Sequence, residues 1–226
     1  MESVFLQPLC LVLALTTTTI SMGFLTCYMH PLTEYYLSTI HAIIATIYAS
    51  IAYCSLSDIN EISYTFIIFS HITLGYFFVD LFNIASKGIK KNFEFVAHHI
   101  LFSLIIIWMV YGKIYHMFGA AVITTEVSTI FLNQYHFLTY YGKNNEMLYK
   151  FKNLQIILLT LVFFLSRIMF LTSLVITHSE TILNDLILVL AAIFSIGINY
   201  FWFYKLIKKI ILIIKVKYVN NDSKTE

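Results

Sequence analysis

Charged residues are scarce in this chain. They make up 12% of its 226 residues, whereas 59% are hydrophobic. A soluble domain carries about 25% charge, so this composition cannot coat a water-facing surface. Glycine and proline are also rare, at seven and two residues, which excludes a linker-rich or low-complexity chain. With a mean hydropathy of +0.81, these shortages exclude soluble enzymes and disordered scaffolds, and they predict an all-α, polytopic membrane protein.

The sequence also has few cysteines, a small net charge and none of the common nucleotide-binding motifs. The three cysteines are an odd number and all lie in apolar stretches, which argues against a disulfide framework. A net charge of +2 is too small to predict a nucleic-acid partner, because polyanion binding needs a clustered basic face. The sequence has no glycine-rich phosphate loop and no nucleophile elbow, so the common ATPases and serine hydrolases are excluded.

Seven segments are long and apolar enough to cross the membrane as helices, since about 20 apolar residues span its hydrocarbon core. They are 4–27, 35–55, 62–83, 93–111, 115–138, 154–178 and 182–206. The first has no basic residue before its apolar core and no small-residue cleavage pattern, so it is interpreted as a retained helix rather than a signal peptide. The fold class predicted is a bundle of seven transmembrane helices.

Lysines predict the orientation of these spans. If all seven cross, twelve lysines fall on one side of the membrane, in the loops after the third, fifth and seventh spans. The loops on the opposite side hold one lysine, Lys113, and three acidic residues. Because cytosolic loops collect lysine and arginine, the C-terminus is predicted to be cytosolic and the N-terminus lumenal or extracellular.

Polar side chains inside the spans fall into two layers when depth is counted at about 1.5 Å per residue from the span edges. The layer nearer the cytosol contains His41, Asp80, His98, His99, Asn133 and Asn199, and the layer near the midplane contains His71, Glu126 and Arg167. Glu126, Thr129 and Asn133 share one helical face by their spacing. Ionisable groups in a span are costly unless they face the bundle interior, so these side chains are predicted to point inward.

Several of these residues have more than one interpretation. Glu126 and Arg167 either form a structural ion pair or line a transport pathway. Either His98 or His99 could serve as a general base, because histidine titrates near neutral pH, or both could make structural hydrogen bonds. No metal is predicted, since no span carries histidines at ligand spacing. His116, His136 and His178 are interpreted as interfacial, and Asp185 as a solvated or first-turn helix charge.

Five motifs in this order resemble the TLC domain, the membrane domain of ceramide synthases and of other lipid-related proteins. They are Ser38-Thr39-x-His41, Gly75–Leu81 (GYFFVDL), His98-His99, Glu126–Gln134 (EVSTIFLNQ) and Phe163–Arg167 (FFLSR). The resemblance covers about residues 30–210, and it is greatest to the branch called TLC domain-containing protein four. It implies a six-helix barrel around a lipid-accessible cavity, with 1–29 as an added transmembrane helix, 30–215 as the TLC domain and 216–226 as a short polar cytosolic tail.

The resemblance also implies a function. In ceramide synthases the histidine pair is followed by His-Asp and a further Asp, where this chain has Thr125-Glu126 and Thr129. The leading expectation is a protein of the endoplasmic reticulum that binds or handles lipid, acts in lipid homeostasis and needs no cofactor. The expected lining is His41, His71, Asp80, Ser128, Thr129, Asn133, Arg167 and Asn199.

Two alternatives to lipid handling stay open. One is a ceramide synthase-like N-acyltransferase of sphingolipid metabolism, with acyl-CoA and a long-chain base as substrates. Its catalytic residues would be His98, His99 and Glu126. The other is a transporter, although the sequence shows none of the inverted repeats or interrupted helix pairs that indicate one.

Overall fold

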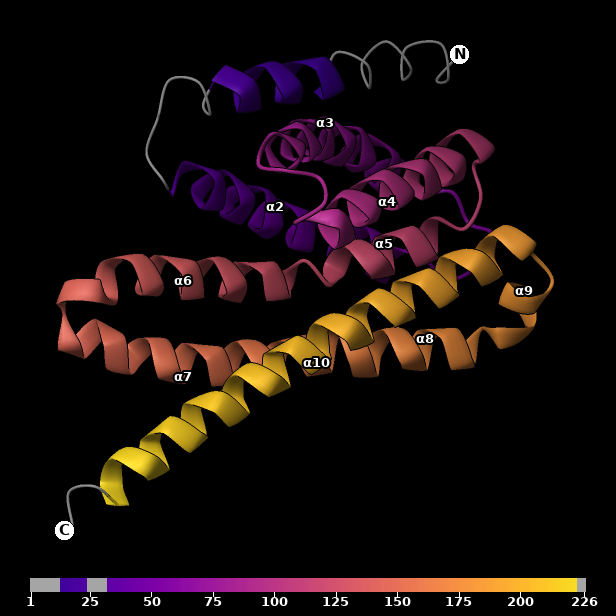
Figure 1. Cartoon of the computed structure of the whole chain (residues 1–226). Helices are drawn as coiled ribbons and strands as arrows, with labels where there is room; N and C mark the ends of the chain where they lie inside the picture. The colour runs from indigo at the N-terminus through magenta and orange to yellow at the C-terminus, as the bar shows by residue number, and fades with distance from the viewer. Residues whose placement is uncertain (1–12, 24–31, 223–226) are drawn as a thin grey trace. The chain divides into compact units, whose positions relative to one another are not determined.

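The computed structural model describes residues 13–23 and 32–222 (Figure 1). Within these two ranges the regular elements are all helices, and no strand occurs. The predicted all-α class is therefore confirmed. The chain divides into two compact units, Met1–Val127 and Ser128–Glu226, which are described in turn.

The first unit contains a helix over 13–23 and four further helices. These are α2 (Thr33–Ser55), α3 (Tyr64–Ser86), α4 (Phe93–Gly112) and α5 (His116–Thr124). The hydroxyl of Ser63 begins α3 by accepting a hydrogen bond from the Phe66 amide at 3.1 Å, a typical N-cap. The helix over 13–23 packs closely on α3 at Gly75, where an added Cβ would lie 2.6 Å from the carbonyl oxygen of Ala14.

The second unit begins with a helical hairpin and ends with one long helix. In chain order its elements are α6 (Val127–Tyr141), the 3₁₀ turn η1 (Gly142–Asn144), α7 (Glu146–Phe163), the π-helix η2 (Phe164–Phe170), α8 (Leu171–Thr177), α9 (Ser179–Leu183) and α10 (Leu186–Asp222). Tyr135, Ile156 and Leu159 form a buried core between α6 and α7, and α10 packs on it through Leu206 and Ile210. Asp185 caps α10 by accepting from the amides of Ile187 and Leu188, as a first-turn charge would.

Five helical stretches of the described residues are long and apolar enough to cross a membrane. They are Thr33–Ser55, Tyr64–Ser86, Phe93–Gly112, Glu146–Thr177 and Leu186–Lys215. The protein is thus an integral, multi-pass membrane protein. The predicted spans 35–55, 62–83 and 93–111 match three of these helices to within three residues. The predicted first span, 4–27, lies largely outside the described residues, of which 13–23 are helical.

The predicted span 115–138 is two helices, α5 and α6, with a break at Thr125 and Glu126. The hydroxyls of Thr124 and Thr125 donate to the carbonyls of Ala121 and Val122, which competes with the α-helical ladder. The Glu126 amide then bonds the Ile123 carbonyl, three residues back. The prediction that Glu126 continues one helical face with Thr129 and Asn133 is therefore wrong, because Glu126 lies outside α6.

Small side chains line the inside of α2, and large ones cover its outside. Ala45 and Ala52 are fully buried, whereas Ile40, Ile47 and Ile51 are each more than half exposed. Helix α2 packs on α3 and α5, and α5 supplies its own small residues, Gly119, Ala120 and Ala121. Small residues let membrane helices approach closely, while lipid solvates the isoleucines.

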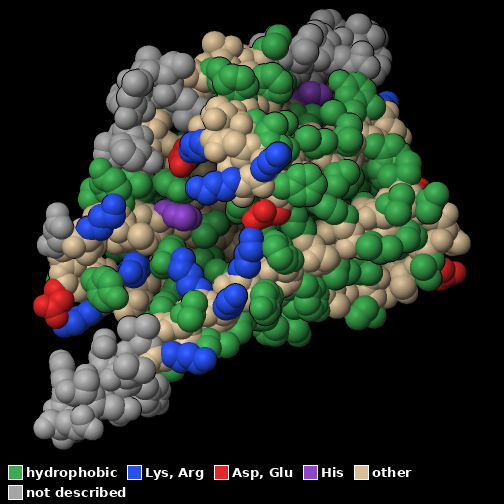
Figure 2. Space-filling view, in the orientation of Figure 1, with side chains coloured by type: hydrophobic (Ala, Val, Ile, Leu, Met, Phe, Trp, Pro, Cys, Tyr) green, Lys and Arg blue, Asp and Glu red, His purple; other side chains and the backbone are tan. Residues whose placement is uncertain are grey.

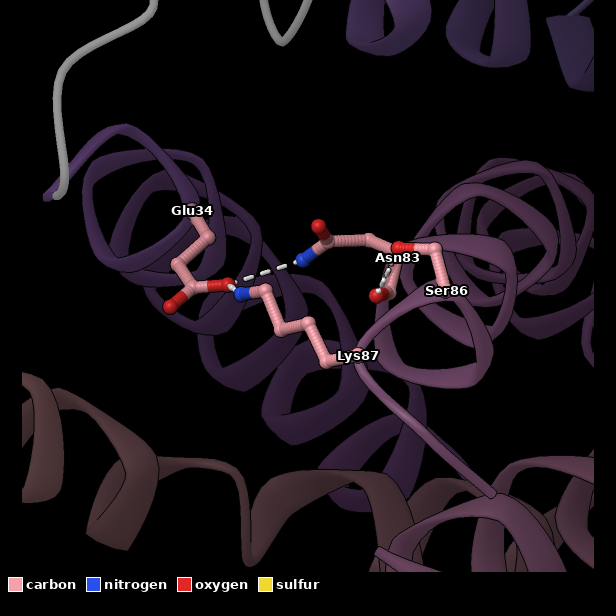
Figure 3. Close-up of polar contacts among 4 residues, drawn as sticks. All are labelled: Glu34, Asn83, Ser86 and Lys87. Atoms are coloured by element: carbon pink, nitrogen blue, oxygen red, sulfur yellow. Dashed lines mark hydrogen bonds and ion pairs between the residues drawn. The ribbon is translucent and has the colours of Figure 1, made fainter.

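Polar contacts join the N-terminal end of α2 to the C-terminal end of α3 (Figure 3). The Glu34 carboxylate, in the first turn of α2, accepts a hydrogen bond from Asn83 Nδ2 at 2.8 Å and forms an ion pair with Lys87 at the C-cap of α3. Partial burial lowers the pKa of the Lys87 ammonium below its ordinary value. Both charges suit their helix ends, because the helix dipole favours anions at the N-terminus and cations at the C-terminus.

We predict that Gly119→Ala destabilises the protein by about 1–3 kcal/mol, the usual cost of overpacking. A Cβ at Gly119 would overlap the ring of Phe66, which is 1% exposed and cannot retreat, and would lie 3.0 Å from Met109 Sδ. The matched control is Gly197→Ala in α10, where a Cβ meets nothing within 4 Å. Thermal unfolding in detergent should show a lower midpoint for the first variant only; equal midpoints would contradict this account of the packing.

Candidate functional site

Three helices of the first unit bring five polar side chains together. They are His41 of α2, Tyr76 and Asp80 of α3, and His98 and His99 of α4. The three histidines are each 7–8% exposed. The ring of His41 stacks on the ring of Tyr76 at 3.9 Å, and the Tyr76 hydroxyl interacts with Ser38 and Asp80. We call these five residues the histidine cluster.

His99 uses both of its ring nitrogens. Nε2 lies 2.8 Å from an Asp80 carboxylate oxygen, and Nδ1 lies 2.9 Å from the carbonyl oxygen of Phe95. A neutral imidazole has only one N–H donor, and both partners are acceptors when Asp80 is ionised. Both nitrogens of His99 are therefore engaged by oxygen atoms of the protein. In this arrangement His99 offers no lone pair to a substrate.

His98 and His41 complete the cluster through aromatic contacts. The ring of Phe77 lies 4.9 Å from His99, 6.4 Å from His98 and 6.0 Å from His41, centroid to centroid. His98 also packs on Phe102 at 4.4 Å. His41 Nε2 lies 3.4 Å from Thr73 Oγ1. The apolar rings exclude water between the histidines, which strengthens the electrostatic interactions among them.

Glu126 belongs with the histidine cluster, and His71 is held separately. The charge of Glu126 acts on His41 and on His99, so the three residues predicted to be catalytic, His98, His99 and Glu126, are in one region. His71 is 8% exposed, and its Nδ1 lies 2.8 Å from the Ile67 carbonyl oxygen of its own helix. That contact satisfies His71 locally.

The second unit contains a separate polar cluster around Arg167 of η2, which is 6% exposed. Its Nε donates to Ser128 Oγ at 2.7 Å, Nη2 to Thr129 Oγ1 at 3.3 Å and Nη1 to Asn199 Oδ1 at 3.4 Å. Three different nitrogens thus connect η2 to α6 and α10. We call this group the arginine cluster. The predicted ion pair between Arg167 and Glu126 stays a prediction.

The side chains of Asn199 and Arg167 are hydrogen-bonded, although the sequence predicts them in different layers. The predicted depth of Asn199 in the membrane stays a prediction. Asn133, on α6, is 3% exposed, and its Nδ2 has no hydrogen-bond partner among the described residues.

Two residues of interest were not identified from the sequence. The sequence does hold a signal for Tyr76, because this residue stands one helical turn before Asp80 within the GYFFVDL motif. His116 is fully buried, not interfacial as predicted. Its Nδ1 accepts from the Ser63 amide at 3.0 Å, and Nε2 donates to the Met109 carbonyl at 3.1 Å. Because His116 stands at the end of a predicted membrane span, the sequence did not indicate this structural role.

An apolar groove of about 360 Å³ lies between α7, η2 and α10 of the second unit. It is lined by Ile157, Thr160, Leu161, Phe164, Phe203 and Ile210. Its size falls within the range of small-ligand pockets, and its wall offers only the Thr160 hydroxyl, which already donates to its own helix. None of the lining residues was among the predicted cavity residues. In the described ranges no group of three or more histidine, cysteine or acidic side chains is placed to hold a metal ion.

Comparison with known families now identifies the chain. Residues 31–208 match the family model of the TLC domain. The protein belongs to the TLC domain family. No curated protein and no solved structure matches it. The histidine cluster and the arginine cluster both lie within the matched residues, as does the groove except for Ile210.

We predict that Ser128→Ala destabilises the TLC domain by about 1–3 kcal/mol, because it leaves one donor of a buried guanidinium without its acceptor. Ser166→Ala is the matched control. Its hydroxyl lies on η2 beside Arg167 but donates only to the Val162 carbonyl of its own helix. Thermal unfolding of the two purified variants should place Ser128→Ala clearly below Ser166→Ala, and the reverse order would show that the arginine cluster contributes little.

Proposed function

We propose that this protein binds a membrane lipid at the histidine cluster and acts in membrane lipid homeostasis. The observation that supports the proposal is the burial of four polar side chains, three of them histidines, beside the partly buried Asp80, among three membrane-spanning helices. Such groups are costly in a membrane and mark functional sites there by default. Membership of the TLC domain family supports a lipid-related role.

The chemistry of the cluster favours a lipid with an oxygen-rich head. The Asp80 carboxyl group lies against His99, and Thr73 and Tyr76 add hydroxyls beside His41. These groups can donate to and accept from hydroxyl, ester or amide groups. The surrounding rings, Phe77 and Phe102, present apolar surface to a chain.

A second candidate function is N-acyl transfer from acyl-CoA to a long-chain base. In that reaction the amine nitrogen attacks the thioester carbonyl, the C–N bond forms, the C–S bond breaks, and the amine proton must pass to a base. Both nitrogens of His99 are already engaged, so His98 would be the base and the Asp80–His99 pair would support it. Glu126 would add negative charge that stabilises the resulting imidazolium.

We also propose the finer architecture and location. Helices α5 and α6 together form one proposed crossing, since 116–141 would extend about 39 Å at 1.5 Å per residue. With the five stretches of the described residues and the predicted first span, 4–27, the count is seven, with six in a barrel. The branch of TLC domain-containing protein four is the proposed subgroup, because the five motifs in their order resemble it most. The endoplasmic reticulum is the proposed membrane.

Photo-crosslinking tests the proposed lipid site. Membranes containing the protein are given a phospholipid with a photoreactive acyl chain, and labelled peptides are mapped by mass spectrometry. We expect labels on α3 and α4 beside the histidine cluster, and a several-fold loss of these labels in His98→Ala. His178→Ala, outside the cluster, is the control and should label normally. Labels confined to outward residues of α2 such as Ile40 and Ile47, which are exposed, would refute an internal site.

The same purified variants, supplied with acyl-CoA and long-chain bases, distinguish binding from turnover. Amide product in the wild type that disappears in folded His98→Ala would establish the acyltransferase. Retention of the label without product would establish a binding protein.

The orientation has its own test. Because twelve lysines fall on one side if there are seven spans, and lysines collect in the cytosol, an epitope at the C-terminus should be digested by protease added to sealed microsomes. An epitope at the N-terminus should be protected until detergent is added. The opposite pattern, or digestion of both epitopes, would refute the seven-span topology.

A further inference from the structure

One end of the second unit is strongly basic. The start of the α6–α7 hairpin turn through early α7 (140–152) and the second half of α10 (205–215) contain seven lysines and one acidic residue, Glu146. The lysines are Lys143, Lys150, Lys152, Lys205, Lys208, Lys209 and Lys215. Figure 2 shows lysine side chains gathered over the region where α7 begins and the later part of α10 lies. We call this surface the basic end.

Two of these lysines lie over tyrosine rings. Lys209 Nζ, from α10, lies 4.1 Å from the centroid of the Tyr135 ring on α6. The charge of Lys152, from α7, also acts on Tyr135, and its Nζ lies 4.2 Å from the Tyr149 ring. The charge of Lys209 reaches His136 as well. Like charges brought together from separate helices repel, and the aromatic faces offset only part of this repulsion.

The one carboxylate of the basic end does not neutralise this pair of lysines. Glu146 forms an ion pair with Lys150 at 3.0 Å, one helical turn away on α7. Lys209 is exposed and Lys152 is half-buried, while Tyr135 beneath them is 7% exposed. The two ammonium groups thus belong to one basic end and lie over tyrosine rings. An anion that contacts this end would relieve the repulsion among its lysines.

The position of the basic end indicates which anion it meets. It lies where two membrane-spanning stretches, Glu146–Thr177 and Leu186–Lys215, leave the apolar region, which is the level of lipid headgroups. Clusters of four to eight basic residues at this level attract anionic lipids, at about 1 kcal/mol per residue. We propose that Lys152 and Lys209 bind the anionic headgroup of a phospholipid. This site shares no residue with the histidine cluster, so it is independent of the proposed function.

Native mass spectrometry of the delipidated, full-length protein tests the proposal. The protein in non-ionic detergent is titrated with phosphatidylserine or with phosphatidylcholine of the same chains. We expect the wild type to prefer phosphatidylserine by about tenfold or more, and Lys152→Gln/Lys209→Gln to lose most of this preference. Salt at about 1 M should weaken it too, because the screening length falls to about 3 Å.

The matched control is Lys90→Gln/Lys91→Gln in the first unit. These two lysines are also exposed and also flank membrane-spanning helices, so the control should keep the preference. Equal affinity of the wild type for both lipids, or equal loss in both double variants, would overturn the site. Displacement of bound phosphatidylserine by millimolar inorganic phosphate would show a site for free anions and would overturn the lipid assignment.

A second pair of variants covers the case in which the Lys152→Gln/Lys209→Gln protein does not fold. Lys152→Arg/Lys209→Arg retains both charges and should retain the preference, whereas Lys152→Gln alone should reduce it several-fold. Loss of the preference in the arginine pair, or an unchanged preference in Lys152→Gln, would contradict recognition by charge at these positions.

Discussion

The structure depends on the satisfaction of polar groups where no water is available. In a membrane each buried donor or acceptor must find its partner inside the protein, at a cost of several kcal/mol if it does not. Arg167 meets this condition through three neutral oxygens on α6 and α10. His116 meets it through one amide and one carbonyl. Each of these side chains fixes the relative positions of the segments that it joins within its unit, because any shift would leave a polar atom unpaired.

The apolar part of the packing is less demanding, and its pattern reverses that of a soluble protein. In α2 the alanines lie inside and the isoleucines outside, since lipid solvates a large apolar side chain as well as a protein core does. Interior residues are therefore small, because close approach of the helices matters more there than the hydrophobicity of the side chain. Gly75 and Gly119 follow from this, because at both positions a neighbouring group occupies the place of a Cβ.

Sequence reasoning located the membrane helices well where apolar runs end in charged or turn residues, as for α2, α3 and α4. It failed at α7 and α10, which continue beyond their apolar cores through residues such as Lys150 and Lys208. Long lysine side chains sustain a helix at the membrane edge, so the end of hydrophobicity is not the end of the helix. The break at Thr125 was also missed, since its cause is a local competition for carbonyls that hydropathy does not register.

For the candidate site, the sequence identified the residues but not their division of roles. The pair His98–His99 was one motif with two open interpretations, and the contacts of His99 with Asp80 and Phe95 now separate its members. A histidine whose two ring nitrogens both lie against oxygen atoms is positioned by them, whereas a general base must present a lone pair. The contacts of His99 therefore leave His98 as the member of the pair that the acyl-transfer hypothesis requires as its base.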